Sequence, residues 1–82
     1  MVKVTFSDRY KREVSKIKDA SIKERLEKQI IKISQNPEIG KPMMYNRKGT
    51  REVYLPPFRL SYSYDKTLDM LYFIEFYHKD NQ

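Results

Sequence analysis

The amino-acid sequence predicts an α+β domain of order β-α-α-β-β-β, with two N-terminal helices packed on one face of a small, mostly antiparallel sheet. Three observations support this fold class: an alternating β-branched segment opens the chain, two amphipathic helical stretches follow, and three strand-like segments fill the second half. At 82 residues the chain has the length of one small domain, so we expect residues 1–82 to share a single core.

The first half contains a short strand and two helices. Residues 2–6, VKVTF, alternate apolar and polar positions as a half-buried strand does. Ser7 suits the N-cap of a short helix, and Ser21 with Glu24 three residues later predicts a capping box at the start of a longer one. Pro37 ends that second helix, because proline disfavours helical geometry in the preceding residue. The apolar positions at helical spacing are Tyr10, Val14 and Ile17 in the first helix, and Ile22, Leu26, Ile30 and Ile33 in the second.

The second half is predicted to be rich in strands after a loop over residues 38–49. Segments 51–55 and 58–64 alternate apolar and polar side chains, whereas segment 68–77 is almost continuously apolar. Such a continuous run is typical of a central strand covered on both faces, or nearly so. Residues 65–68 predict the hairpin that joins the last two strands.

The Pro56-Pro57 connection sets the pairing of the two middle strands. Proline in the second turn position indicates a cis bond or a wider loop. A two-residue connection places Tyr54 opposite Arg59 and sorts the side chains onto two faces. The face expected to meet the helices carries Val53, Leu55, Phe58, Leu60 and Tyr62. The other face carries Glu52, Tyr54, Arg59, Ser61 and Ser63, and its serines leave Arg59 above a shallow floor.

Positive charge is concentrated in the middle of the chain. The whole sequence has 17 basic and 11 acidic residues, which gives a net charge of +6. Within residues 41–59 the only carboxylate is Glu52, and the basic residues are Lys41, Arg47, Lys48, Arg51 and Arg59. This local excess favours a polyanionic partner, either a nucleic acid or an acidic protein.

Composition argues against several classes of chemistry. The chain has no cysteine and a single histidine, His78, so neither a disulfide framework nor a transition-metal site is expected. The two glycines form no phosphate-binding loop, and nothing suggests a Ser-His-Asp constellation. No stretch is apolar enough for a signal peptide or a membrane span. We therefore expect a cytoplasmic protein that has no cofactor and no membrane partner.

The residues that remain for chemistry are basic and aromatic. Arg59 stands on the polar face, and His78 and Lys79 follow the last apolar segment. Their structural alternatives are a surface ion pair between Arg59 and Glu52, and a solvated histidine near the end of the chain. Tyr54 beside Arg59 can serve packing or can stack a nucleic-acid base.

Three motifs share their order and spacing with a known family. They are "NPEIGKPM" after the second helix, "KGTREVYLPPFRLSYSY" across the middle strands, and "LYFIEFYHKD" in the last strand. Together with the order of elements, they resemble the RelE/ParE toxin superfamily of type II toxin–antitoxin systems over essentially the whole chain. The strongest mark of these families is a Tyr-Arg-hydrophobe-X-Tyr strand. The segment FRLSY, residues 58–62, matches it with Phe in the first place.

The resemblance implies an activity and roles for individual residues. RelE-like and YoeB-like members are mRNA interferases that cleave codons in the ribosomal A site, and a cognate antitoxin holds them inactive. By resemblance, Arg59 stabilises a phosphate, and His78 acts as general acid, since Tyr77-His78 matches the start of the terminal Tyr-His-Tyr of the YoeB-like branch. Lys79 replaces the last tyrosine of that signature, and Met43 stands where the same branch carries a carboxylate base.

Metal-free RNA cleavage needs a base for the 2′-hydroxyl, cations for the phosphate and an acid for the leaving 5′-oxygen. The expected catalytic residues are Arg59, His78, Lys79 and, as a base suggested by its position on the sheet, Glu52. The expected RNA-binding residues are Lys41, Arg47, Lys48, Arg51, Tyr54 and Tyr77. This assignment requires Arg59 and His78 to lie on the same open side of the sheet. Two alternatives stay open: a ParE-like inhibitor of DNA gyrase, and an inactive protein that keeps the fold and antitoxin binding.

Overall fold

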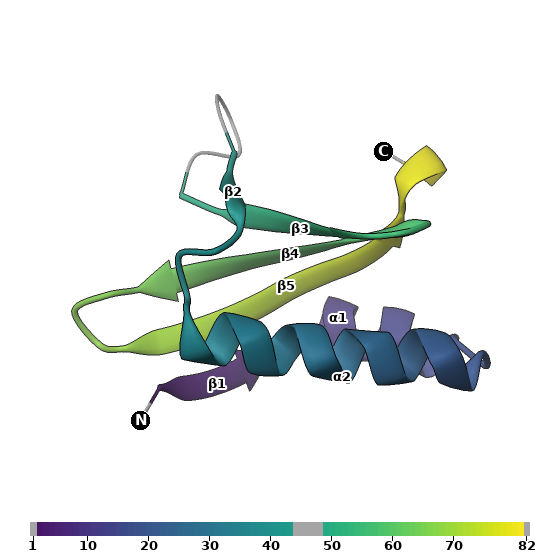
Figure 1. The fold of residues 1–82 in the computed structure, drawn as a ribbon, viewed down its shortest axis with the longest axis horizontal. Helices are drawn as coiled ribbons and strands as arrows, with labels where there is room; N and C mark the ends of the chain where they lie inside the picture. The colour runs from purple at the N-terminus through teal and green to yellow at the C-terminus, as the bar shows by residue number, and fades with distance from the viewer. Residues whose placement is uncertain (1, 44–48, 82) are drawn as a thin grey trace.

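The computed structural model describes residues 2–43 and 49–81. Its elements are β1 (Lys3–Phe6), α1 (Asp8–Ser15), α2 (Ala20–Gln35), β2 (Lys41–Pro42), β3 (Arg51–Leu55), β4 (Phe58–Asp65), β5 (Met70–His78) and the 3-10 turn η2 (Lys79–Asn81). The α+β class and the predicted order of helices and long strands are confirmed (Figure 1). The structure adds β2, a two-residue strand inside the segment expected to be loop.

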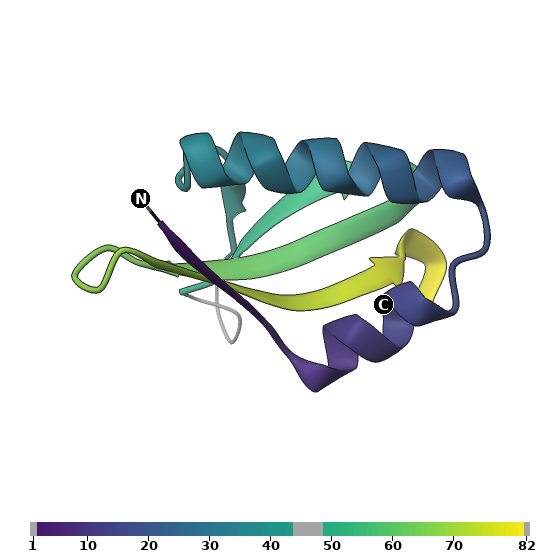
Figure 2. The same ribbon diagram turned by 90° about the horizontal axis from the view of Figure 1, so that it is seen from below.

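The strands form one five-stranded sheet in the order β1-β5-β4-β3-β2. β1 pairs with β5 in parallel, and the other neighbours pair antiparallel. The last long strand, β5, is therefore an internal strand with β1 on one side and β4 on the other, while the middle place in the sheet belongs to β4. Figures 1 and 2 show α1 and α2 on the same side of the sheet. The expectation that β5 is covered on both faces is wrong, because Tyr72 on its other face is 42% exposed.

The sheet surface turned away from the two helices is called the open face below. The registers and the alternation of side chains along each strand assign residues to it. Its members include Lys41, Glu52, Tyr54, Arg59, Ser61, Tyr72 and Tyr77. The opposite surface, which meets the helices, builds the core.

The core joins both helices to the three longest strands. Its buried residues are Tyr10, Leu26, Ile33, Leu55, Leu60, Tyr62, Leu71, Phe73 and Phe76. Phe73 lies at its centre, where its ring packs 5.5 Å from Phe6 and 5.8 Å from Tyr62, measured between ring centroids. This single apolar layer fixes the sheet against the helices and leaves the open face for other uses.

Short polar side chains start both helices. Ser7 is the N-cap of α1 as predicted, and its Oγ accepts a hydrogen bond from the Tyr10 N–H at 2.9 Å. The predicted capping box in which Ser21 caps α2 is wrong. The N-cap is Asp19, whose carboxylate accepts from the Ser21 N–H at 2.9 Å and so satisfies a donor of the first turn.

The β3–β4 hairpin has the predicted register. Tyr54 lies opposite Arg59, Leu55 lies opposite Phe58, and the connecting Pro56-Pro57 bond is cis. The predicted sorting of side chains between the two faces is therefore confirmed for these two strands.

A β-bulge interrupts the pairing of β4 with β5. Tyr62 pairs with Phe73 and Ser61 pairs with Glu75, so Ile74 is left without a partner on β4. A single extra residue reverses the alternation of side chains in the rest of the strand. Phe73 before the bulge and Phe76 after it consequently both point into the core, three positions apart.

Helix α1 holds the bulge in place. β1 pairs with β5 only as far as Phe73, and α1 satisfies backbone groups of β5 beyond that point. The Ser7 hydroxyl donates to the Ile74 carbonyl at 2.5 Å, and the Phe76 N–H donates to Glu13 Oε1 at 3.2 Å. These side chains replace the neighbouring strand that β5 lacks over this stretch.

We predict that Glu13→Ala destabilises the fold by about 1–3 kcal/mol, because it leaves the partly buried Phe76 N–H without its acceptor. Urea denaturation followed by circular dichroism measures this loss. Glu13→Gln keeps an acceptor oxygen and should recover most of the stability. Equal stability of Glu13→Ala and the parent chain would contradict the role given to this bond.

Tyr10 makes the stability sensitive to alkaline pH. Burial, with a smaller contribution from Glu27, raises the pKa of Tyr10 to about 12. The unfolded side chain titrates near pH 10, so its contribution is complete below pH 10 and is lost as the pH rises towards 12.

We expect the parent chain to lose about 2–3 kcal/mol more than Tyr10→Phe between pH 9 and pH 12, which corresponds to two units of pKa shift. Chemical denaturation at a series of pH values measures the difference between the two chains. Lysine titration affects both chains alike and cancels in the comparison. Parallel stability profiles would show that Tyr10 does not carry this dependence.

Candidate nucleic-acid interface

Glu52 and Arg59 form the centre of the open face. Arg59 Nη1 lies 3.2 Å from Glu52 Oε1, and the Tyr77 hydroxyl donates to Glu52 Oε2 at 2.5 Å. Glu52 is only 7% exposed, whereas the Arg59 side chain is 35% exposed. A buried carboxylate thus fixes a cation that reaches the surface, and strands β3, β4 and β5 each contribute one of the three residues.

Two cations flank the exposed ring of Tyr54. The Arg59 guanidinium carbon lies 5.6 Å from the ring centroid and the Lys79 Nζ lies 5.8 Å from it. Tyr54 is 52% exposed, so part of its ring is open to solvent. Cation–π attraction at these distances holds the three side chains together and leaves an aromatic surface between positive charges.

A small cavity of about 170 Å³ lies beside this cluster. Its lining residues are Lys41, Met43, Glu52, Tyr54 and Arg59. The β2–β3 ladder places Lys41 opposite Glu52, and the Met43 N–H donates to the Thr50 carbonyl at 2.9 Å. From the sequence, Met43 was named only as the residue that stands in place of a carboxylate base, and it was not counted among the site residues because its side chain is apolar.

Arg51 lies on the other face and holds the loop before β2. Its Nη1 donates to the carbonyls of Gly40 at 2.8 Å and Glu38 at 3.0 Å. Tyr62 secures the same loop, since its hydroxyl donates to the Pro37 carbonyl and accepts from the Gly40 N–H. Arg51 pairs with Tyr62, whose side chain faces the core, so Arg51 and Arg59 lie on opposite faces of the sheet. The expected contact of Arg51 with RNA stays a prediction.

His78 does not share the open face with Arg59, so the expected arrangement of the two residues is wrong. The bulge pairs Arg59 with Tyr77 and Phe58 with His78. The imidazole packs edge-on against Phe58 at 5.5 Å between ring centroids, and its Nδ1 accepts from the Asp80 N–H at 3.2 Å. The histidine therefore sits on the helix side of the strand, apart from the cluster.

The remaining predicted residues divide into three groups. Lys41 and Lys79 belong to the cluster, as expected. Tyr77 is 8% exposed and its hydroxyl donates to Glu52, so it supports the position of Glu52 and offers little surface to RNA. Arg47 and Lys48 lie outside the described residues.

The cluster is suited to binding a polyanion. Lys41, Arg59 and Lys79 place three positive charges around the one carboxylate of Glu52. Arg59 Nε is buried and makes no hydrogen bond within the described part of the chain. The Arg59 side chain as a whole is 35% exposed, so other parts of it remain accessible to a ligand. Phosphate binding by Lys and Arg with base stacking on an aromatic ring is a general mode of single-strand recognition. No group of three or more His, Asp or Glu side chains within residues 2–43 and 49–81 is placed to hold a metal ion.

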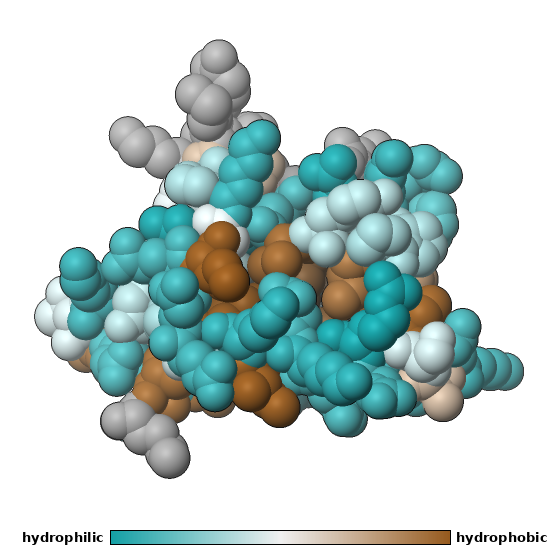
Figure 3. Space-filling model, in the orientation of Figure 1, coloured by the Kyte–Doolittle hydropathy of each residue, from teal (hydrophilic) through white to brown (hydrophobic). Residues whose placement is uncertain are grey.

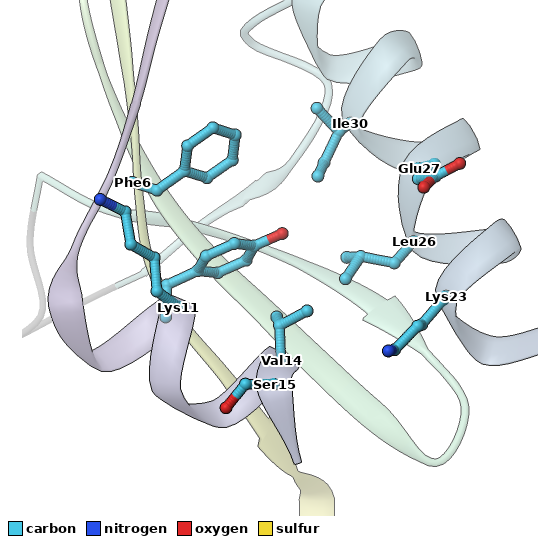
Figure 4. Close-up of a pocket in the computed structure, with 9 residues that line it drawn as sticks. Phe6, Lys11, Val14, Ser15, Lys23, Leu26, Glu27 and Ile30 are labelled. Atoms are coloured by element: carbon cyan, nitrogen blue, oxygen red, sulfur yellow. The ribbon is translucent and has the colours of Figure 1, made fainter. Parts of the chain in front are cut away.

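A larger groove lies on the opposite side of the molecule. It measures about 410 Å³ and runs between α1 and α2, with Phe6, Val14, Leu26 and Ile30 among its lining residues (Figure 4). Its walls are apolar and only Lys11, Lys23 and Glu27 bring charges to it. This groove is therefore a gap in the packing between the two helices. The polar and charged residues suited to catalysis or nucleic-acid binding line the smaller cavity on the open face.

The fold and the arginine-bearing strand define the class of this protein as a toxin of the RelE/ParE superfamily. The chain belongs to the family described as ParE toxin of type II toxin–antitoxin system, parDE, whose model matches residues 4–82. No curated protein matches the sequence. The predicted superfamily is thus confirmed.

Solved structures share the fold at low sequence identity. The isolated RelE toxin of E. coli matches with a TM-score of 0.82 and 17% identity, over 100% of this chain and 88% of that one. A chain of the intact E. coli RelBE toxin–antitoxin complex matches with a TM-score of 0.79 and 18% identity, over 93% of this chain and 94% of that one. A chain of the RelBE2 toxin–antitoxin complex of Mycobacterium tuberculosis matches with a TM-score of 0.74 and 20% identity, over 95% of this chain and 98% of that one.

None of the helices in the described residues is long and apolar enough to cross a membrane.

We predict that Glu52→Ala destabilises the protein by about 2–4 kcal/mol, because it leaves Arg59 and the buried Tyr77 hydroxyl without their acceptor. Tyr77→Phe removes one hydrogen bond and should cost less, about 1–2 kcal/mol. Urea denaturation of both variants and of the double variant measures the coupling. Additive losses in the double variant would show that the two residues are not coupled through this bond.

Proposed function

We propose that this toxin is a metal-independent, ribosome-dependent mRNA endoribonuclease that a cognate antitoxin neutralises. The observation that carries the proposal is the cluster on the open face: Arg59 and Lys79 flank the exposed ring of Tyr54, and Arg59 and Tyr54 line the 170 Å³ cavity. This combination supplies phosphate binding and base stacking at one place. The solved RelE-like structures support the antitoxin partner, since two of them are toxin–antitoxin complexes.

The chemistry follows from the charges around the cavity. The 2′-oxygen of the RNA attacks the phosphorus, its proton leaves, the bond to the 5′-oxygen breaks, and that oxygen takes up a proton. Arg59 and Lys41 balance the charge that develops on the phosphate, which is the largest catalytic contribution available to a site of this kind. Glu52 is the carboxylate that lines the cavity, and it receives the 2′-hydroxyl proton in this proposal. Lys79 takes the role of proton donor, because His78 lies on the other side of the strand.

A second candidate function is inhibition of DNA gyrase, the activity of ParE-like toxins. Two observations favour it: the matching family model describes ParE toxins, and the pairing of Phe58 with His78 separates the histidine from Arg59. In this alternative the open face binds its target without cleaving RNA. Mapping of mRNA ends and a DNA supercoiling assay distinguish the two functions.

We predict that induced expression of the parent chain arrests growth and produces new mRNA ends within translated codons. Arg59→Ala should reduce cleavage by about 10²–10³-fold, because it removes the central phosphate contact. Lys79→Ala and Tyr54→Ala should reduce it by roughly tenfold or more. Sequencing of mRNA 5′ ends after induction provides the measurement.

The matched control is His78→Gln, which changes the neighbouring residue on the opposite face. Cleavage should survive this change, since the imidazole contacts Phe58 and Asp80. Loss of cleavage in His78→Gln with retention in Lys79→Ala would reverse the assignment of the proton donor. Growth arrest with intact mRNA and inhibited supercoiling would establish the gyrase alternative, and absence of growth arrest would indicate an inactive member of the family.

A further inference from the structure

Strand β2 is too short to fix the position of Lys41 by itself. Within the described residues, its ladder to β3 consists of two residue pairs, Lys41 with Glu52 and Pro42 with Arg51. Strands in globular proteins are usually about 3–10 residues long, so two pairs add little rigidity. Lys41 nevertheless lines the cavity on the open face. Its backbone therefore needs support from another part of the molecule.

Apolar packing gives the segment before β2 little of this support. The segment runs from the end of α2 to the edge of the sheet (Figure 1), and its one isoleucine, Ile39, is 47% exposed. Figure 3, in the same orientation, shows hydrophobic atoms that remain at the surface between α2 and the strands. The position of the segment consequently depends on hydrogen bonds.

A buried tyrosine supplies two of these bonds. Tyr62 of β4 is fully buried, and its hydroxyl donates to the Pro37 carbonyl at 2.8 Å and accepts from the Gly40 N–H at 2.9 Å. Burial raises the pKa of Tyr62 above its ordinary value, so the hydroxyl stays protonated and keeps its donor at neutral pH. The contact is close, because a Cβ at Gly40 would lie 2.6 Å from the Tyr62 hydroxyl oxygen. Only glycine leaves room for it.

Arg51 holds the same segment from the neighbouring strand. Its Nη1 donates to the Gly40 carbonyl at 2.8 Å and to the Glu38 carbonyl at 3.0 Å, and its Nη2 lies 3.8 Å from the Glu38 carboxylate. Gly40 is thus bound through its N–H by Tyr62 and through its carbonyl by Arg51. This glycine directly precedes Lys41, so the backbone is fixed at the point where the lysine begins.

The register connects these contacts to the open face. One row across β2, β3 and β4 lies on the helix side and consists of Pro42, Arg51 and Tyr62. The next row consists of Lys41, Glu52 and Ser61. Consecutive rows point to opposite faces of a sheet, so the residues that bind Gly40 lie directly behind the row that carries Lys41.

We propose that Tyr62 and Arg51 are positioning residues for Lys41. They hold Gly40 on the helix side of the sheet and so fix the direction in which the lysine leaves β2 on the other side. The inference rests on the proposed function for the charge that Lys41 balances at the phosphate. Misplacement of a catalytic group by about 1 Å can cost about 10²-fold in rate, so a loosely held β2 would lose much of this contribution.

The first test observes the positioning itself and does not depend on toxin activity. Tyr62→Phe removes the hydroxyl and keeps the buried ring. Tyr64→Phe is the matched control on the same strand, because the Tyr64 hydroxyl donates to Asp69 instead. Amide hydrogen exchange in the ¹⁵N-labelled protein is followed by NMR at the Met43 N–H, which donates to the Thr50 carbonyl next to β2.

We expect exchange at Met43 to be roughly tenfold faster in Tyr62→Phe than in Tyr64→Phe, while the amides of β5 keep equal protection in both variants. Equal exchange at Met43 in the two variants would overturn the proposal. Faster exchange throughout β5 in Tyr62→Phe alone would also overturn it, because the hydroxyl would then support the whole fold and not β2 in particular.

The second test determines whether Tyr62 acts through Lys41. Cleavage of mRNA is compared at matched toxin levels in Tyr62→Phe, in Lys41→Ala and in the double variant. Each single change should lower cleavage by roughly tenfold. The double variant should cleave no more slowly than Lys41→Ala, because a lysine that is absent cannot be misplaced. A further loss in the double variant would indicate a merely structural role and would overturn the proposal.

Arg51→Ala extends this test to the second positioning residue. Cleavage should fall by roughly tenfold in the parent chain and should not fall further when Lys41→Ala is already present. A loss that persists without Lys41 would show that Arg51 contributes to RNA binding by itself, and would overturn its positioning role.

Gly40→Ala is a variant that leaves both positioning side chains intact. Its Cβ displaces the segment from Tyr62, so exchange at Met43 should accelerate and cleavage should fall as in Tyr62→Phe. Parent-like exchange and cleavage in both variants would refute the positioning role. A parent chain that leaves mRNA intact would refute the proposed function instead, and the exchange measurement would still decide whether Tyr62 holds β2.

Discussion

The β-bulge at Ile74 is the constraint on which the open face depends. Before it, the register places Leu71 and Phe73 in the core; after it, the register places Phe76 in the core and Tyr77 beside Arg59. An unbroken β5 would reverse this arrangement, exposing Phe76 and burying the tyrosine hydroxyl against the helices. The bulge therefore allows one strand to place both Phe73 and Phe76 in the core and still direct Tyr77 to the open face.

The bulge also explains why helix α1 matters for a face it does not touch. Ser7 binds the carbonyl of Ile74, the extra residue, and Glu13 binds the N–H of Phe76 two residues later. These contacts hold the strand in the register that places the Tyr77 hydroxyl against Glu52. Glu52 in turn fixes Arg59. A chain of direct contacts thus connects the first helix to the cation on the open face, and a site built on such supported side chains is preorganised for its ligand.

Much of this arrangement could be predicted from the sequence, but which side chains of β5 face the core and which face the open side could not. The β3–β4 pairing follows from two clean alternations and a two-residue connection, so Tyr54 and Arg59 were placed correctly. The run from 68 to 77 is apolar at nearly every position and hides the change of phase. The signal that was present is the three-residue step between the buried Phe73 and Phe76, which no regular strand allows. The predicted N-cap of α2 was also wrong, because Asp19 and Ser21 are both residue types that cap helices well and only the path of the backbone distinguishes them.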